Sequence, residues 1–418
     1  MSGPLLQGLV VVVVVLSSTI SLAEDVPIWP QWRGPSRDGQ VTGATWPERL
    51  SAENFKLRWR VELGPSYSGP IVAADRVFTT ATEDEKLEVV RALDRKTGEQ
   101  LWELSWEGSM RVPFFAASNG SWIRSTPAYD GQSLFVAGMR DVLVSIDAAT
   151  GKQQWKVDFV DEFGTALPAF GFVCSPLVDG DLLYVQVGAA LRKLDKRTGK
   201  TVWKALDEGG GMMGSAFSSP YMAEIAGKRQ LLVQTRKVLA GVDPESGRVL
   251  WSQAIPAFRG MNILTPVVYG DTVFTSAYGG KSILFKIERD GDDFEAKEAW
   301  TNKLQGYMST PVVIGDRLYM HLRNQRFACL DLAAGEEDWI STPFGKYWSL
   351  VANGDRILAL DQRGELLLIG ARPDEVELID RLVISEDPTW AHLAVCGNEV
   401  FVRELRALAA YEWPASDK

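Results

Sequence analysis

The sequence predicts an all-β protein, an eight-bladed β-propeller of four-stranded antiparallel blades that is closed by an N-terminal strand. The first observation behind this fold is a nine-residue phrase with an Asp, a Gly four residues later and a Trp four residues after that. Its copies are Asp94-Gly98-Trp102, Asp147-Gly151-Trp155, Asp195-Gly199-Trp203, Asp243-Gly247-Trp251 and Asp331-Gly335-Trp339. The first four copies recur at about 50 residues, a period typical of repeat units that bury their faces against neighbouring units.

The second observation is the make-up of one repeat, which is clearest in residues 175–203. Four short β-prone runs, at 177–178, 182–187, 191–194 and 200–203, are separated by turn signals, and this is the pattern of an antiparallel meander. In the last turn the Asp side chain can accept hydrogen bonds from its own turn, and the Gly can adopt the positive φ that a tight hairpin needs. Because one meander cannot bury both of its faces, radial packing of such units gives a propeller.

The third observation is the motif that opens each repeat. The openers are Ser68-Gly69-Pro70, Ser125-Thr126-Pro127, Cys174-Ser175-Pro176, Ser218-Ser219-Pro220, Leu264-Thr265-Pro266 and Ser309-Thr310-Pro311. Two degenerate units follow, beginning at Ser349 and His392, and bring the number of blades to eight. The last unit has three strands, whereas an orphan run at 56–61 carries Trp59. We expect that run to complete the last blade, which leaves no free sheet edge.

The phrase Asp-x-x-Thr-Gly-x-x-x-Trp after a Ser-Pro opener resembles the pyrroloquinoline-quinone (PQQ) type repeat, over about residues 57–413. That family contains quinoprotein dehydrogenases and also outer-membrane-assembly propellers that bind no cofactor, so the resemblance implies a fold and leaves the function open. In that family the repeated Trp forms a structural girdle between blades. The resemblance assigns this role to Trp59, Trp102, Trp155, Trp203, Trp251, Trp300 and Trp339.

The N-terminal residues 1–23 hold no charged side chain and contain an apolar run from Leu5 to Leu16, before the small residues Ser21 and Ala23. Such a run is too short to span a bilayer. We expect a secretory signal peptide and a periplasmic or secreted protein without a transmembrane segment, with an uncleaved anchor as the alternative.

Residues 24–56 are rich in Trp, Pro and Gly. Pro and Gly exclude a regular element, and several Trp side chains are too apolar for a free tail. We therefore expect an irregular arm docked on the propeller, either as a lid over one face or as a strap that holds the closing strand. Its Trp32-Arg33-Gly34-Pro35 resembles the leader of a group of secreted bacterial PQQ-like propellers. The propeller then occupies 57–413, and 414–418 form a tail.

Composition and motifs argue against several classes of function. The formal net charge of −10 excludes broad nucleic-acid binding. Cys174, Cys329 and Cys396 lie in different blades and are expected to be buried thiols without a disulfide framework. The two histidines, His321 and His392, have no partner at metal-ligand spacing, so we expect no metal site.

The variable loops indicate which rim recognises a partner. The Asp-x-x-Thr-Gly turns are short and uniform, whereas the insertions at 103–124, 156–173, 204–217 and 252–264 all fall on the opposite rim, and variable loops on a rigid ring usually carry recognition. The second hairpins place cations on that same rim. We expect these cations to form an anion-binding mouth with two tryptophans, the set being Arg140, Arg236, Lys281, Arg323, Arg403, Trp348 and Trp390.

These patterns favour a monomeric, extracytoplasmic scaffold that binds a protein, peptide or anionic glycan and needs no cofactor. If the cations turn outward, recognition falls to the apolar groups Phe114, Phe115, Trp122, Trp348 and Trp390. The alternative is a PQQ-dependent quinoprotein oxidoreductase. Such enzymes pair PQQ with calcium and often with a vicinal disulfide, and this chain has no adjacent cysteines.

Overall fold

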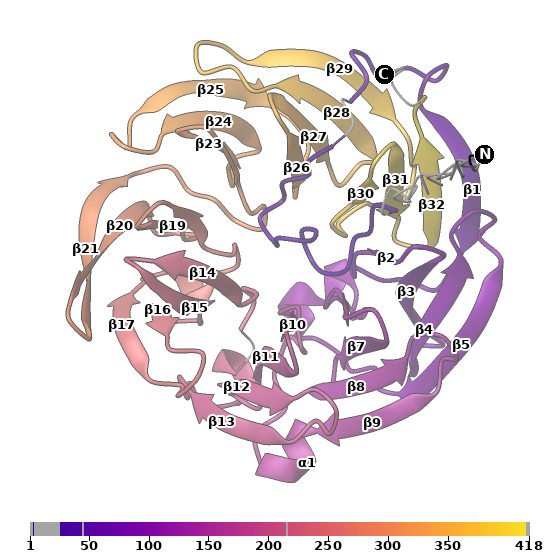
Figure 1. Ribbon diagram of the computed structural model, residues 1–418, viewed down its shortest axis with the longest axis horizontal. Coiled ribbons are helices and arrows are strands. Elements are labelled where there is room, and N and C mark those ends of the chain that lie inside the picture. The colour runs from indigo at the N-terminus through magenta and orange to yellow at the C-terminus, as the bar shows by residue number, and fades with distance from the viewer. Residues whose placement is uncertain (1–2, 4–25, 44–45, 215, 415–418) are drawn as a thin grey trace.

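The computed structural model describes residues 3, 26–43, 46–214 and 216–414, and it confirms the predicted all-β propeller. Eight four-stranded sheets stand as blades around a central axis (Figure 1). We number them blade 1 to blade 8 in chain order. Most of the expected signal peptide, and residues 415–418 of the expected tail, lie outside the described residues.

The strands of blades 1 to 4 are β2 (Ile71–Val72), β3 (Arg76–Glu83), β4 (Leu87–Asp94) and β5 (Gln100–Glu107); β6 (Ala128–Tyr129), β7 (Ser133–Gly138), β8 (Val142–Asp147) and β9 (Gln153–Asp158); β10 (Leu177–Asp179), β11 (Leu182–Val187), β12 (Ala190–Asp195) and β13 (Thr201–Ala205); and β14 (Tyr221–Ile225), β15 (Lys228–Gln234), β16 (Val238–Val242) and β17 (Val249–Ala254).

The strands of blades 5 to 8 are β18 (Val267–Tyr269), β19 (Thr272–Ser276), β20 (Ser282–Asp290) and β21 (Asp293–Asn302); β22 (Val312–Ile314), β23 (Arg317–His321), β24 (Arg326–Asp331) and β25 (Glu337–Pro343); β26 (Ser349–Asn353), β27 (Arg356–Leu360), β28 (Glu365–Gly370) and β29 (Glu377–Val383); and β30 (Ala394–Cys396), β31 (Glu399–Arg403), β32 (Ala407–Glu412) and β1 (Lys56–Glu62). The helices are short and lie in the loops that lead into blades 2 to 5: η1 (Phe114–Asn119), α1 (Phe159–Phe163), η2 (Gly211–Met213) and η3 (Phe258–Gly260).

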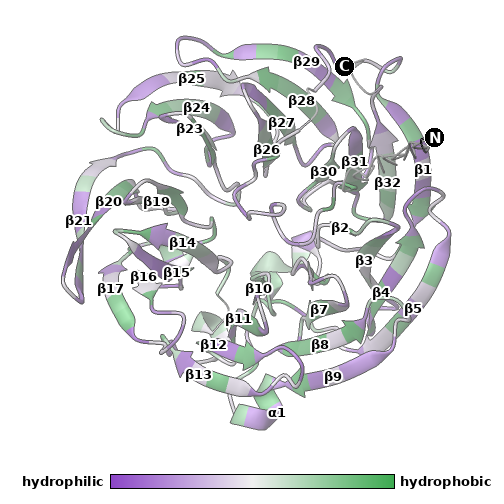
Figure 2. Ribbon diagram, in the orientation of Figure 1, coloured by the Kyte–Doolittle hydropathy of each residue, from purple (hydrophilic) through white to green (hydrophobic). Residues whose placement is uncertain are grey.

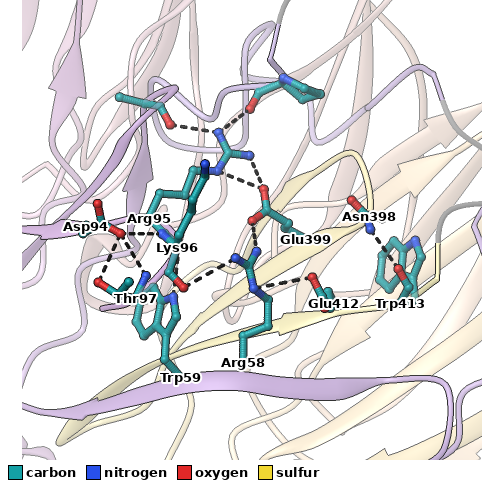
Figure 3. A network of polar contacts seen from close by, with 12 residues as sticks. Arg58, Trp59, Asp94, Arg95, Lys96, Thr97, Asn398, Glu399, Glu412 and Trp413 are labelled. Atoms are coloured by element: carbon teal, nitrogen blue, oxygen red, sulfur yellow. Dashed lines mark hydrogen bonds and ion pairs between the residues drawn. The ribbon is translucent and has the colours of Figure 1, made fainter. Parts of the chain in front are cut away.

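The ring closes as predicted, because β1 pairs antiparallel with β32 in blade 8. Figure 3 shows the charged network beside this closure. Glu399 of blade 8 accepts hydrogen bonds from Arg58 of β1 and from Arg95 of blade 1, where Arg95 Nε lies 2.9 Å from Glu399 Oε2. Arg95 also donates to the carbonyls of Ala73 and Pro27, each at 2.9 Å. The first and last blades are thus joined by side chains as well as by the shared sheet.

The repeated phrase has a physical explanation in blade 1. Asp94 Oδ1 accepts the backbone N–H groups of Lys96 and Thr97 at 2.9 Å, and the Thr97 hydroxyl at 3.1 Å. These bonds, the Thr97 N–H first, lower the pKa of Asp94. Gly98 has φ +77°, and a Cβ at this position would lie 2.9 Å from the Trp59 ring. The Gly therefore allows the Trp of the preceding blade to lie on the turn.

The indole N–H groups continue this pattern around the ring. They donate to backbone carbonyls of the following blade in the pairs Trp59–Arg95, Trp102–Ala148, Trp155–Lys196, Trp203–Pro244, Trp300–Leu332 and Trp339–Arg372. Trp251 instead donates to Gln230 Oε1 within its own blade at 2.8 Å. The difference follows from blade 5, whose last hairpin is the long β20–β21 pair and lacks the Asp-x-x-Thr-Gly turn.

Apolar side chains fill the spaces between blades. One core cluster joins Ile71 and Phe78 of blade 1 to Leu134 and Val144 of blade 2, and similar clusters follow around the ring. Figure 2 shows hydrophobic colour along middle strands such as β3 and β8, and mixed colour along outer strands such as β5 and β9. The three cysteines are free and buried, as expected. Among the described residues, no helix has the length and apolar character needed to cross a bilayer.

The arm runs through the central channel (Figure 1). Trp29 pairs with Val72 of blade 1 through backbone hydrogen bonds of 2.8 and 2.9 Å. Farther along, Arg37 Nη1 donates to the Pro176 carbonyl of blade 3 at 2.8 Å, and Arg33 Nη2 donates to the Pro311 carbonyl of blade 6 at 2.7 Å. The arm is therefore a plug that crosses the channel and binds blades 1, 3 and 6.

Candidate functional site

A cavity of about 850 Å³ opens at one end of the channel, where the loops lead into the blades. We call it the mouth cavity and this end the mouth rim; the opposite end, with the Asp-Gly turns, is the turn rim. Trp32 of the arm is part of the cavity wall. The guanidinium carbons of Arg33 and Arg37 lie 5.6 and 5.9 Å from the centre of the Trp32 ring. The plug thus supplies part of the site.

The repeat builds a ring of side chains in the cavity wall. Each blade contributes the residue three positions before its opening Pro, or before Leu350 and Leu393 in the two degenerate units. These residues are Tyr67, Arg124, Val173, Phe217, Ile263, Met308, Tyr347 and Trp390. Seven of the eight have an apolar or aromatic body, and Arg124 is the exception. We call this set the mouth ring.

In blades 2 to 6 the residue just before the opening Pro also lines the cavity, and several of these residues join neighbouring blades. The Ser219 hydroxyl accepts the Ser175 N–H at 2.9 Å, Thr265 accepts the Ser219 N–H at 3.2 Å, and Thr310 accepts the Thr265 N–H at 3.1 Å. The openers are hydroxyl-rich because these oxygens satisfy backbone donors that burial would otherwise leave unpaired.

A chain of aromatic contacts runs along one side of the mouth rim, over blades 5 to 8 and blade 1. Ring centroids are separated by 4.6 Å for Tyr278–Tyr307, 5.9 Å for Tyr307–Tyr347, 4.6 Å for Tyr347–Trp390 and 4.8 Å for Trp390–Tyr67. Aromatic pairs at such distances are stabilised beyond the area that they bury. This side, which we call the aromatic sector, is therefore a preformed surface for flat or apolar groups.

Three arginines line the other side, over blades 2 to 5. Arg124 is half-buried and donates to the carbonyls of Trp122 and Gly120 in its own loop, at 3.2 and 3.5 Å; burial lowers its pKa to about 10. Arg236 is buried and donates to the carbonyls of Gly260, Met212 and Arg259. Arg259 is exposed, 5.5 Å from the centre of the Phe115 ring. We call these three residues the arginine sector.

The described residues of the cavity wall include no Asp or Glu. Calcium binds carboxylate and carbonyl oxygens, and three cations in the same wall repel it, so this donor set does not fit the calcium ion of a quinoprotein. Among the described residues, no group of three or more His, Cys, Asp or Glu side chains is placed to hold a metal ion. The wall is suited to an anion.

The cations expected from sequence do not form one ring. Arg236 lines the mouth cavity, whereas Lys281 and Arg323 line a second depression of about 860 Å³ beside blade 5. Arg140 is exposed and lines neither. The structure corrects the assignment of Arg403: this side chain is only 1% exposed, and it donates to the carbonyls of Ala407 at 3.0 Å and Thr80 at 3.2 Å. Arg403 therefore joins blade 8 to blade 1.

The expected aromatic residues lie at the mouth. Trp390 and Trp348 both line the cavity, and Trp348 is buried and stacks on His321 with centroids 4.8 Å apart. Phe115 also lines the cavity, and Trp122 lines an adjoining depression together with Trp390.

The two histidines are held in their neutral form. Burial lowers the pKa of His321 to about 4 and that of His392 to about 3. His321 Nε2 lies 2.9 Å from the Gly345 carbonyl.

Comparisons with known proteins agree with this architecture. A family model described as outer membrane protein assembly factor BamB matches residues 49–112 and 86–341. The BamB of Shewanella oneidensis is 24% identical over 68% of this chain and 66% of its own length. A polyvinylalcohol dehydrogenase of Sphingopyxis is 29% identical over 42% of this chain and 28% of its own.

Among solved structures, BamB from Moraxella catarrhalis superposes with a TM-score of 0.62 at 15% identity, over 86% of this chain and all of that one. At this identity the likeness shows the fold alone. The chain spans about a quarter of the dehydrogenase and about two thirds of the Shewanella factor. The family model, by contrast, matches well over half of this chain: the protein belongs to the BamB-like family of PQQ-type β-propellers.

Proposed function

We propose that the protein is an extracytoplasmic binding propeller that docks a partner protein in the mouth cavity and performs no chemistry on it. One observation carries the proposal: an 850 Å³ cavity is lined by aromatic and methionine side chains with three arginines. Aromatic residues and Arg supply most of the binding energy at protein interfaces. Methionines such as Met212, Met213 and Met308 adapt to irregular apolar surfaces.

The chemistry of the wall supports binding over catalysis. A general acid or base must titrate near the working pH. His392 has a pKa of about 3, and no described Asp or Glu lies in the wall. The described wall therefore offers neither a paired acid and base nor an activated nucleophile. The match to a family described as an assembly factor supports a partner protein over a small substrate.

Site-specific photocrosslinking tests this function. A photoreactive benzoylphenylalanine replaces Phe115, which is 48% exposed at the mouth, or Val202, which is 55% exposed on outer strand β13. We expect discrete protein adducts from the first position and none from the second, because the second lies outside the cavity. Equal adducts at both positions, or glycan-dependent capture that survives protease treatment of the partner fraction, would contradict a protein-docking mouth.

The quinoprotein alternative has its own test, motivated by the partial likeness to a dehydrogenase. The protein is mixed with PQQ and calcium, separated from free cofactor and examined for quinone absorbance. Because the described cavity wall has no carboxylate to bind calcium, we expect that the protein retains no PQQ. Stoichiometric, calcium-dependent retention would replace the binding proposal with an oxidoreductase.

A further inference from the structure

The mouth cavity is polarised across its width. The arginine sector lies over blades 2 to 5, and the aromatic sector runs over blades 5 to 8 and blade 1. The whole chain carries a net charge of −10, whereas the described residues of the cavity wall hold three arginines and no carboxylate. The nearby Glu208 carboxylate accepts the Arg236 backbone N–H from outside that wall. Charge in a concave site with low-dielectric walls focuses the field on whatever binds there.

Arg124 is the distinctive residue of this arrangement. At the seven equivalent positions of the mouth ring the other blades place Tyr, Val, Phe, Ile, Met or Trp. Packing alone would be satisfied by an apolar residue at the eighth. No ion pair to Arg124 exists among the described residues, and the two carbonyls that it contacts belong to its own loop. A half-buried guanidinium in this setting gains a strong, charge-assisted contact when a carboxylate enters the cavity.

Apolar side chains continue from the cavity onto the mouth rim. Phe114 is 90% exposed, Phe258 50%, Met212 47% and Met308 41%. Exposed apolar side chains gathered around one cavity are typical of an interaction site. Met212, Phe258 and Met308 also line the cavity, whereas Phe114 lies beyond it against Phe115. A peptide segment can fill the cavity and also cover the rim at Phe114.

From the polarised wall and the exposed apolar side chains around it we infer that the docked segment is an acidic peptide. One of its carboxylate side chains lies against the arginine sector, and an apolar or aromatic side chain lies against the aromatic sector. This inference rests on the proposed function and names the chemistry of the partner. Arg236 holds the loops at 212 and 259–260 in place through its carbonyl contacts, and Arg124 and Arg259 provide the charge that the carboxylate meets.

Two fluorescent probes with nearly the same aromatic body test separately whether the cavity binds an apolar group and whether it prefers an anion. Anilinonaphthalene sulfonate carries an anionic group, and N-phenyl-naphthylamine does not. We expect the wild-type protein to bind both, and the anionic probe about tenfold more tightly. In Arg124→Gln this preference should fall below about threefold, and in Arg124→Lys it should partly return. The control Arg197→Gln removes a cation that is exposed on the turn rim and paired with Asp181, and it should change neither affinity.

A peptide selection then tests the partner class directly. Random decapeptides with a fixed central Glu, Gln or Lys are captured on the immobilised wild-type protein, and we expect the Glu library to be enriched. Absence of neutral-probe binding would overturn the mouth as a docking site, and with it the proposed function. Neutral binding without preference for the anionic probe or for the Glu library would overturn only the acidic-peptide inference. If Arg124→Gln fails to fold, enrichment of the Glu library on the wild-type protein tests the acidic-peptide inference by itself.

Discussion

The two rims of this propeller use equivalent repeat positions in opposite ways. On the turn rim the Asp and Gly of each copy do the same work, in which the Asp organises its turn and the Trp of the preceding blade lies on the Gly. On the mouth rim the eight equivalent ring positions differ from blade to blade. The residue types are repeated where side chains pack against neighbouring blades, and they vary where side chains line the cavity.

The largest effect is expected from removing the strand that closes the ring. Deleting residues 24–61 takes away most of β1, exposes β32 as an unpaired edge and removes the channel plug. An unpaired edge strand is a template for aggregation. We expect an insoluble product or a loss of cooperative melting, measured by gel filtration and thermal unfolding. A soluble monomer with the wild-type melting temperature would show that neither rim depends on closure.

The ring closure, the repeat and the number of blades could be predicted because each depends on local residue patterns. These patterns are the Ser-Pro openers, the Asp-Gly turns and one orphan strand with Trp59. The path of the arm through the channel could not be predicted from the sequence. Arg33 and Arg37 bind the carbonyls of Pro311 and Pro176, and any residue presents a carbonyl, so the partners carry no signature in sequence.

Part of the candidate site could be predicted from the sequence. Aligning the openers places Tyr67, Arg124, Tyr347 and Trp390 at one position, which signals the mouth ring without a structure. The second-hairpin cations predicted from the sequence include Arg236, which lines the cavity, and Arg403, which does not. The position is equivalent, but the side chain turns to nearby backbone carbonyls that only the closed ring brings together.

A matched pair of glycine substitutions sharpens the contrast between the rims. Gly199 on the turn rim has φ +72°, and an added Cβ would lie 2.8 Å from Trp155; Gly209 in a mouth loop has φ +75° and no neighbour within 4 Å. Left-handed strain costs both alanine variants about 1–2 kcal/mol, and overpacking should add about 1–3 kcal/mol to Gly199→Ala alone. Denaturant unfolding measures the difference, and equal losses would refute the packing role of the turn glycine.

The pH dependence of stability should have opposite signs at the two rims. Hydrogen bonds lower the pKa of turn-rim aspartates such as Asp94, so their stabilisation is lost as the pH falls below their ordinary pKa. At the second hairpin of blade 2, burial raises the pKa of Asp141 to about 7. The folded protein therefore holds that proton more tightly than the unfolded chain, and stability falls as the pH rises from about 4 to about 7.

Asp141→Asn isolates this contribution. Asn tolerates the positive φ of 61° at this position, and its carbonyl oxygen can still accept the Gly188 N–H, which now lies 2.8 Å from Asp141 Oδ2. The variant should lose the decline between pH 4 and 7 and gain on the order of 2–4 kcal/mol over wild type at neutral pH. Parallel pH profiles for variant and wild type, measured by denaturant unfolding, would refute a buried, proton-holding Asp141.

The distinction between a structural rim and a binding rim is tested most directly by two Trp→Ala variants, each measured for stability and for binding. Trp203 lies on the Gly247 turn and donates to the Pro244 carbonyl at 3.3 Å. Trp390 stacks on Tyr67 and meets Tyr347 edge-to-face at the mouth. Trp203→Ala should lower the free energy of unfolding by about 3 kcal/mol and leave N-phenyl-naphthylamine affinity unchanged. Trp390→Ala should lower it by about 1 kcal/mol and weaken the probe about tenfold. If the two variants lose stability and affinity in the same proportion, the division of labour between the rims is wrong.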